Sequence, residues 1–89
     1  MITIKVKLFY KTQRELAMTL NTIVDAYWDD EISEETMITS IRDTYINNPK
    51  KYMKQGGFTT VLKQQCGKRR LEVIERILRD SDFTNGKNL

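Results

Sequence analysis

The stretch from Gly56 to Leu78, GGFTTVLKQQCGKRRLEVIERIL, constrains the fold more than any other part of this sequence. Apolar residues recur at helical spacing on both sides of Gly67, first over 58–66 and then over 71–78. Lys68, Arg69 and Arg70 follow the glycine directly. A helix start carries unpaired N–H groups and partial positive charge, so cations at this place favour the binding of an anion.

The pattern does not decide whether Gly67 ends one helix or lies inside a longer one. A glycine within a helix costs about 1 kcal/mol, which weakens a continuous helix without forbidding it. If the glycine breaks the helix, residues 58–78 are helix-turn-helix-like, although Lys63 and Arg76 stand where that motif prefers a small and an aliphatic residue. An ordinary helical hairpin with a basic turn explains the same residues.

The remainder of the chain predicts a small, mainly α domain of four to five helices. Thr12 and Glu15 form a capping box at the start of a helix over 13–28. Ser33 caps a second helix, which stops near 47–48, and Asn48-Pro49 begins a short third one that ends at Gly56. Thr59 or Thr60 caps the helical region that closes near 79–80. The centres of the main apolar stripes, and so the predicted core, are Leu20, Ile41, Leu62 and Ile74.

The N-terminus alternates apolar and polar residues over 2–9, which is typical of a short half-buried β-strand. Nothing later in the sequence reads as a second strand, so this one needs a partner. Pairing with its copy in a second protomer would give a homodimer, and the order strand, helix, helix would suit a ribbon-helix-helix protein. A frayed helical arm is the alternative. We expect a single compact domain over 1–80 and a polar, mobile tail over 81–89.

Charge is segregated along the chain, although the net charge is only +3. Residues 15–48 hold most of the acids, whereas the run from Lys50 to Arg70 contains no acid at all. A basic face suits nucleic acid or an acidic protein surface. The predicted nucleic-acid-binding residues are Lys50, Lys51, Lys54, Lys63, Lys68, Arg69 and Arg70, with Phe58 or Tyr52 as stacking or packing supports. The alternative is a protein-protein interaction module whose basic face meets an acidic surface, either of another protein or of a second copy.

Several classes of function find no support in the sequence. There is no histidine, the usual general base near neutral pH, so we do not expect an enzyme or a cofactor. The acids between Asp29 and Glu35 lack the spacing of a calcium loop, so no metal site is predicted. No apolar run is long enough for a bilayer, and the single Cys66 fits a cytoplasmic protein. Cys66 itself is either a small core residue or a thiol activated by the cations that follow it.

Three segments carry a resemblance to a known family. They are the capped YKTQRELA, the DAYW turn with ISEE, and FTTVLKQQCGKRRL. Together they are similar to a family of short uncharacterised bacterial proteins, over most of residues 10–78. That family has no assigned function, so the resemblance implies one compact unit and no particular activity.

Overall fold

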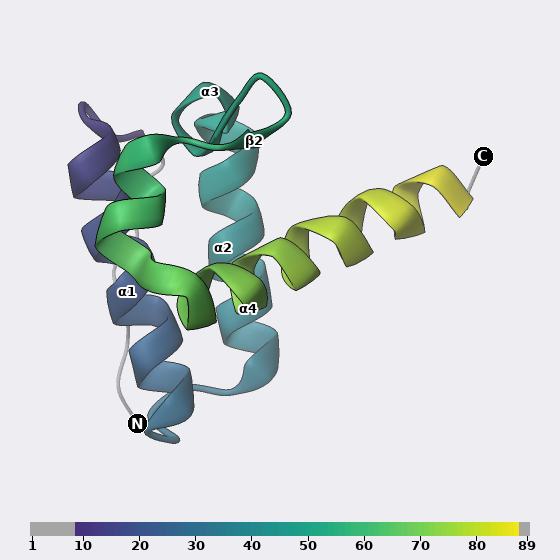
Figure 1. The fold of residues 1–89 in the computed structure, drawn as a ribbon. Coiled ribbons are helices and arrows are strands. Elements are labelled where there is room, and N and C mark those ends of the chain that lie inside the picture. Colours follow the sequence, from purple (N-terminus) through teal and green to yellow (C-terminus); the bar gives the residue numbers. More distant parts are fainter. Residues whose placement is uncertain (1–8, 88–89) are drawn as a thin grey trace.

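The computed structural model describes the backbone of residues 9–87 and the side chains of residues 9–79. Two long helices, α1 (Gln13–Trp28) and α2 (Glu34–Asn47), are followed by the short helix α3 (Pro49–Tyr52). A hairpin of two short strands, β1 (Met53–Lys54) and β2 (Gly57–Phe58), then leads into α4 (Thr60–Lys87). The described chain is therefore mainly helical with one small two-stranded antiparallel sheet (Figure 1).

The predicted helix starts are confirmed for the two long helices and for α4. The Thr12 hydroxyl accepts a hydrogen bond from the Glu15 N–H at 3.0 Å, and the Ser33 hydroxyl accepts one from the Thr36 N–H at 3.1 Å. Thr59 caps α4, since its hydroxyl accepts from the Leu62 N–H at 3.3 Å. Each cap satisfies a backbone donor that the first turn of a helix leaves without a partner.

The short helix α3 begins at Pro49 with Asn48 at the N-cap position, as predicted, but the Asn48 side chain makes no capping hydrogen bond to α3. Its side-chain carbonyl accepts a hydrogen bond from the Tyr10 N–H at 3.1 Å, and its amide donates to the Thr44 carbonyl at 2.9 Å. Asn48 therefore ties the segment before α1 to the end of α2. A buried amide that reaches both segments satisfies backbone groups that a local cap would leave unpaired.

The expectation of no second strand after the N-terminus is wrong, because β1 and β2 lie in the middle of the chain. Met53 pairs with Phe58 and Lys54 pairs with Gly57. The connecting Gln55 and Gly56 have φ values of 54° and 85°, and two positive φ values are what a two-residue hairpin turn of type I′ requires. The predicted N-terminal strand lies, apart from Phe9, outside the described residues. Phe9 is not in a strand.

Gly67 breaks α4, which settles the choice that the sequence left open. Its φ of 80° and ψ of 169° are not helical, so the N-terminal segment of α4 (60–66) and the C-terminal segment (68–87) point in different directions (Figure 1). The C-terminal segment also runs further than expected. It continues beyond 79–80 to Lys87, through most of the stretch predicted as a tail.

The core forms where α4 packs mainly against α1, with α2 beside both. Leu20, Ile41, Leu62 and Ile74 are each fully buried, so the four predicted centres are confirmed. Tyr52 is fully buried as well, and its hydroxyl shares a hydrogen bond with the Thr44 hydroxyl. Tyr52 is therefore a packing residue that joins α3 to α2. Within residues 9–87, no helix combines the length and the apolar character that a bilayer crossing would need.

Candidate functional site

The fold places opposite charges at opposite ends of the α1–α2 pair. The two helices run antiparallel, so the turn between them lies at one end of the molecule (Figure 1). This acidic turn comprises residues 29–35, and its acidic side chains are all exposed: Asp29, Asp30, Glu31, Glu34 and Glu35. No cation occurs between residues 29 and 35. The acidic turn is therefore unsuited to binding an anion.

The opposite end gathers cations from three separate parts of the chain. The start of α1, the end of α2, α3, the hairpin and the start of α4 meet there (Figure 1). Two hydrogen bonds hold these parts together: from the Tyr10 N–H to Asn48, and from the Thr59 N–H to the Tyr52 carbonyl at 3.0 Å. We call this the basic end and define it by its cations, which are Lys11, Arg14, Lys50, Lys51, Lys54 and Lys63. All are exposed except Lys51, which is half-buried.

The seven predicted binding residues are not all brought together. Lys50 and Lys51 lie on α3, Lys54 on β1, and Lys63 on the N-terminal segment of α4, all at the basic end. The other three predicted residues begin the C-terminal segment of α4. Successive residues of a helix are about 100° apart around its axis, so these three side chains leave the helix in three directions.

Arg70 forms an ion pair within the protein. Its Nε and Nη2 donate to the two carboxylate oxygens of Asp25, each at 2.9 Å, and its Nη1 donates to the Cys66 carbonyl at 3.2 Å. The hydrogen bonds from Asp25 raise the pKa of the Arg70 guanidinium above its ordinary value. The pair joins α1 to α4 across the break at Gly67. Arg70 is therefore a structural residue, and changing it together with Lys68 and Arg69 would disturb more than a surface.

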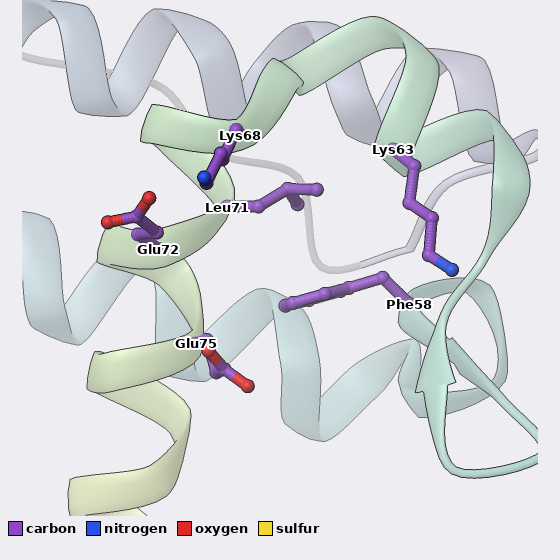
Figure 2. A pocket seen from close by; sticks show the side chains of 6 residues that line it. All are labelled: Phe58, Lys63, Lys68, Leu71, Glu72 and Glu75. Atoms are coloured by element: carbon purple, nitrogen blue, oxygen red, sulfur yellow. The ribbon is translucent and has the colours of Figure 1, made fainter.

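Lys68 lines an open hollow between the hairpin and α4. The hollow has a volume of about 360 Å³ and is lined by Phe58, Lys63, Lys68, Leu71, Glu72 and Glu75. In Figure 2 the Phe58 ring extends from β2 toward the C-terminal segment of α4, with Lys63 and Lys68 on the two sides of the break. This first hollow thus combines an aromatic ring and a leucine with side chains of both charges.

Arg69 lines a second hollow on the other flank of the same helix. It has a volume of about 310 Å³ and is lined by Trp28, Arg69, Glu72, Val73 and Arg76. Trp28 ends α1 and is 45% exposed. Glu72 borders both hollows, so it stands on the exposed ridge between them. An aromatic side chain and two cations therefore occur together a second time.

Cys66 is a core residue and not an activated thiol. It is buried, and its Sγ lies 3.8 Å from the Ala17 carbonyl oxygen. Burial raises the pKa of Cys66 to about 11, and the nearby Arg70 offsets this only in part. The charged thiolate is the reactive form, so a raised pKa makes this thiol inert near neutral pH.

This burial predicts a loss of stability at alkaline pH. The ordinary thiol pKa of 9.0 lies below the folded value of about 11, so between these values the unfolded chain releases a proton that the native chain keeps. The free energy of unfolding should fall in that window by up to about 1.4 kcal/mol per pH unit. Urea unfolding at about pH 8 and about pH 10.5 measures the loss. Cys66→Ala should show a shallower dependence, and an equal one would contradict the assignment.

Sequence reasoning missed Lys11, Arg14 and Trp28 as members of the charged and aromatic surfaces. The two cations belong to a basic N-terminal stretch that is separated from Lys50 by the acidic part of the chain. Their place follows from the antiparallel pairing of α1 and α2, which brings the start of one helix beside the end of the other. The sequence neighbours of Trp28 are acidic, and Arg69 and Arg76 reach it only through tertiary packing.

Comparison with known proteins gives a family and nothing further. Searches of curated proteins and of solved structures found no match. A family model described as "Conserved hypothetical protein" matches residues 7–79, which covers the caps of all three long helices, the N-terminal segment of α4, and the C-terminal segment as far as residue 79. This range includes the segments on which the resemblance was based. The chain belongs to this family of conserved hypothetical proteins.

Proposed function

We propose that this protein binds nucleic acid through its basic end. The observation that carries the proposal is the convergence of six cations from three parts of the chain, opposite the acidic turn. Clustered lysine and arginine side chains neutralise phosphates and release their counterions, which supplies most of the affinity for a nucleic-acid backbone. Five of these cations are exposed and so available to phosphates. Such a role agrees with the cytoplasmic location predicted from the sequence.

The proposal does not depend on a helix-turn-helix motif. Such a motif joins its helices by a turn of about three to four residues. The break inside α4 is much shorter, because it consists of one residue with non-helical φ and ψ, Gly67. In a helix-turn-helix protein, the first turn after the break would belong to the recognition helix and would contact the bases. Here that turn contains Arg70, which is paired with Asp25. At the basic end, by contrast, neither Lys50 nor Lys54 takes part in an ion pair of the described residues.

Binding should weaken with salt, and the weakening should depend on the basic end. Replacing Lys50 and Lys54 with glutamine removes two phosphate contacts and should reduce the slope of log K against log salt by about 1.4 for a single strand. Fluorescence anisotropy of a labelled oligonucleotide over a salt series measures this. Arg42→Gln compared with Lys50→Gln alone is the charge-matched control, because Arg42 is exposed outside the basic end. Equal slopes in these two single variants would contradict the proposal.

A second candidate function is self-association through opposite charges. The acidic turn of one copy is complementary to the basic end of another, and such a head-to-tail contact can repeat along a chain of copies. Sedimentation at low and high salt tests this, since only a charge-driven assembly dissociates on adding salt. The homodimer predicted from the N-terminal strand is a different contact. Val6→Pro should dissociate that dimer at any salt concentration.

A further inference from the structure

The two hollows beside α4 repeat one chemical pattern on opposite flanks of an exposed helical ridge. Phe58 lies with Lys63 and Lys68 in the first hollow, and Trp28 lies with Arg69 and Arg76 in the second. The ridge between them is formed by α4 residues from 68 to 76, with Glu72 bordering both sides. Four cations line the two hollows against two carboxylates, so their combined charge is positive. Lys63 also belongs to the basic end, so the first hollow is continuous with it.

We propose that these hollows bind single-stranded nucleic acid, with one base against Phe58 and another against Trp28. The proposal rests on the proposed function, because it extends the phosphate-binding basic end into a path for one strand. An aromatic ring stacks on any base whose face is free, and neighbouring cations hold the phosphates on either side. A duplex keeps its base faces stacked inside the helix, so these rings could not reach them. The pairing of aromatic rings with cations therefore points to a single strand.

The positions of the two hollows define the path that the strand would follow across the surface. Lys63 and Lys68 stand on the two segments of α4 on either side of the break, and in Figure 2 the Phe58 ring extends toward the C-terminal segment between Leu71 and Glu75. On the far side of the ridge, Arg69 and Arg76 are separated by two helical turns and flank the hollow at Trp28. A strand that leaves the basic end at Lys63 would pass Phe58, cross the ridge, and reach Trp28. The acidic turn begins directly after Trp28 and ends the path, because its five carboxylates have no cation among them, whereas Glu72 on the ridge stands with Lys68 in one hollow and with Arg69 in the other.

Trp28 is itself the probe for this path. It is the single tryptophan of the chain and is 45% exposed, so a base stacked on it should quench its fluorescence. The titration uses an oligothymidylate of about 12 nucleotides and a duplex of equal length. We expect quenching by the single strand, and at least about 10-fold weaker binding of the duplex under the same salt conditions.

Phe58 provides the second and independent measurement. Phe58→Leu keeps an apolar side chain but removes the ring, whereas Phe58→Tyr keeps the ring. The first variant should lose about 5- to 150-fold in affinity for the single strand, because base–aromatic stacking contributes about 1–3 kcal/mol per base. The second should bind like the wild type. If Phe58→Leu does not fold, Arg69→Gln with Arg76→Gln takes its place, since both side chains are exposed and line the other hollow.

The possible outcomes separate this inference from the proposed function. In one outcome, binding depends on salt and is weakened by Lys50→Gln with Lys54→Gln, but Trp28 fluorescence does not change and Phe58→Leu binds like the wild type. This outcome would overturn the path through the hollows and would support binding at the basic end. Equal affinity for single strand and duplex would also overturn the path. Failure to bind either nucleic acid at low salt would overturn both proposals.

Discussion

Replacing Leu62 with alanine is expected to lower the free energy of unfolding by about 2–5 kcal/mol. Leu62 lies in the N-terminal segment of α4, has no exposed surface, and belongs to the main hydrophobic cluster between α1, α2 and α4. Truncation removes buried methyl groups and leaves a cavity that the rigid neighbours cannot fill. In a domain of this size the melting temperature should fall by at least about 8 °C.

The matched control for Leu62→Ala is Ile46→Ala. Ile46 is also a large aliphatic residue on a helix, but it is 66% exposed. Its truncation should change stability by less than about 0.5 kcal/mol. Thermal and urea unfolding of the two variants side by side gives the comparison. Similar losses in both would mean that the N-terminal segment of α4 is not packed against the core as described.

Replacing Gly67 with alanine is expected to destabilise the protein by about 1–3 kcal/mol, although no atom stands in the way of the added methyl group. The cost comes from the backbone, because a φ of 80° with a ψ of 169° is a conformation that essentially only glycine adopts. Straightening the helix would avoid this strain. It would also turn Ile74, Ile77 and Leu78 away from the core in which they are buried.

The sign of this effect decides between the two interpretations of Gly67. In a continuous helix, glycine to alanine would stabilise the protein by about 1 kcal/mol, because alanine is the better helix former. At a break, the same change destabilises. Gly57→Ala is the control, since its φ is not positive and nothing lies near the added methyl group. A Gly67→Ala protein that melts above the wild type would refute the break.

The helices and their starts could be predicted because their signals are local. Thr12, Ser33 and Thr59 each stand next to the N–H groups that they cap, and the apolar stripes of α1 and α2 span several turns. The hairpin could not be found in the same way. Strands of two residues are too short to show alternation, and the pair depends on a turn at Gln55 and Gly56 that sequence alone read as the end of a helix.

The candidate site was less predictable because it depends on tertiary contacts. A run of three cations carries no information on which of them will meet a carboxylate. Asp25 lies 45 residues before Arg70, and only the packing of α1 against α4 brings them together. The same packing brings Trp28 beside Arg69. Composition indicated a basic surface, but the assignment of each cation to an ion pair, a hollow or an end required the fold.

The acidic turn and the basic end place charges of opposite sign at the two ends of the α1–α2 pair. Charges separated in this way would orient the molecule during diffusion, so that the proposed binding end faces a polyanion before contact. The expected consequence is kinetic. Association would be faster than random collision of the same surfaces allows, and added salt would slow the approach more than it speeds the release.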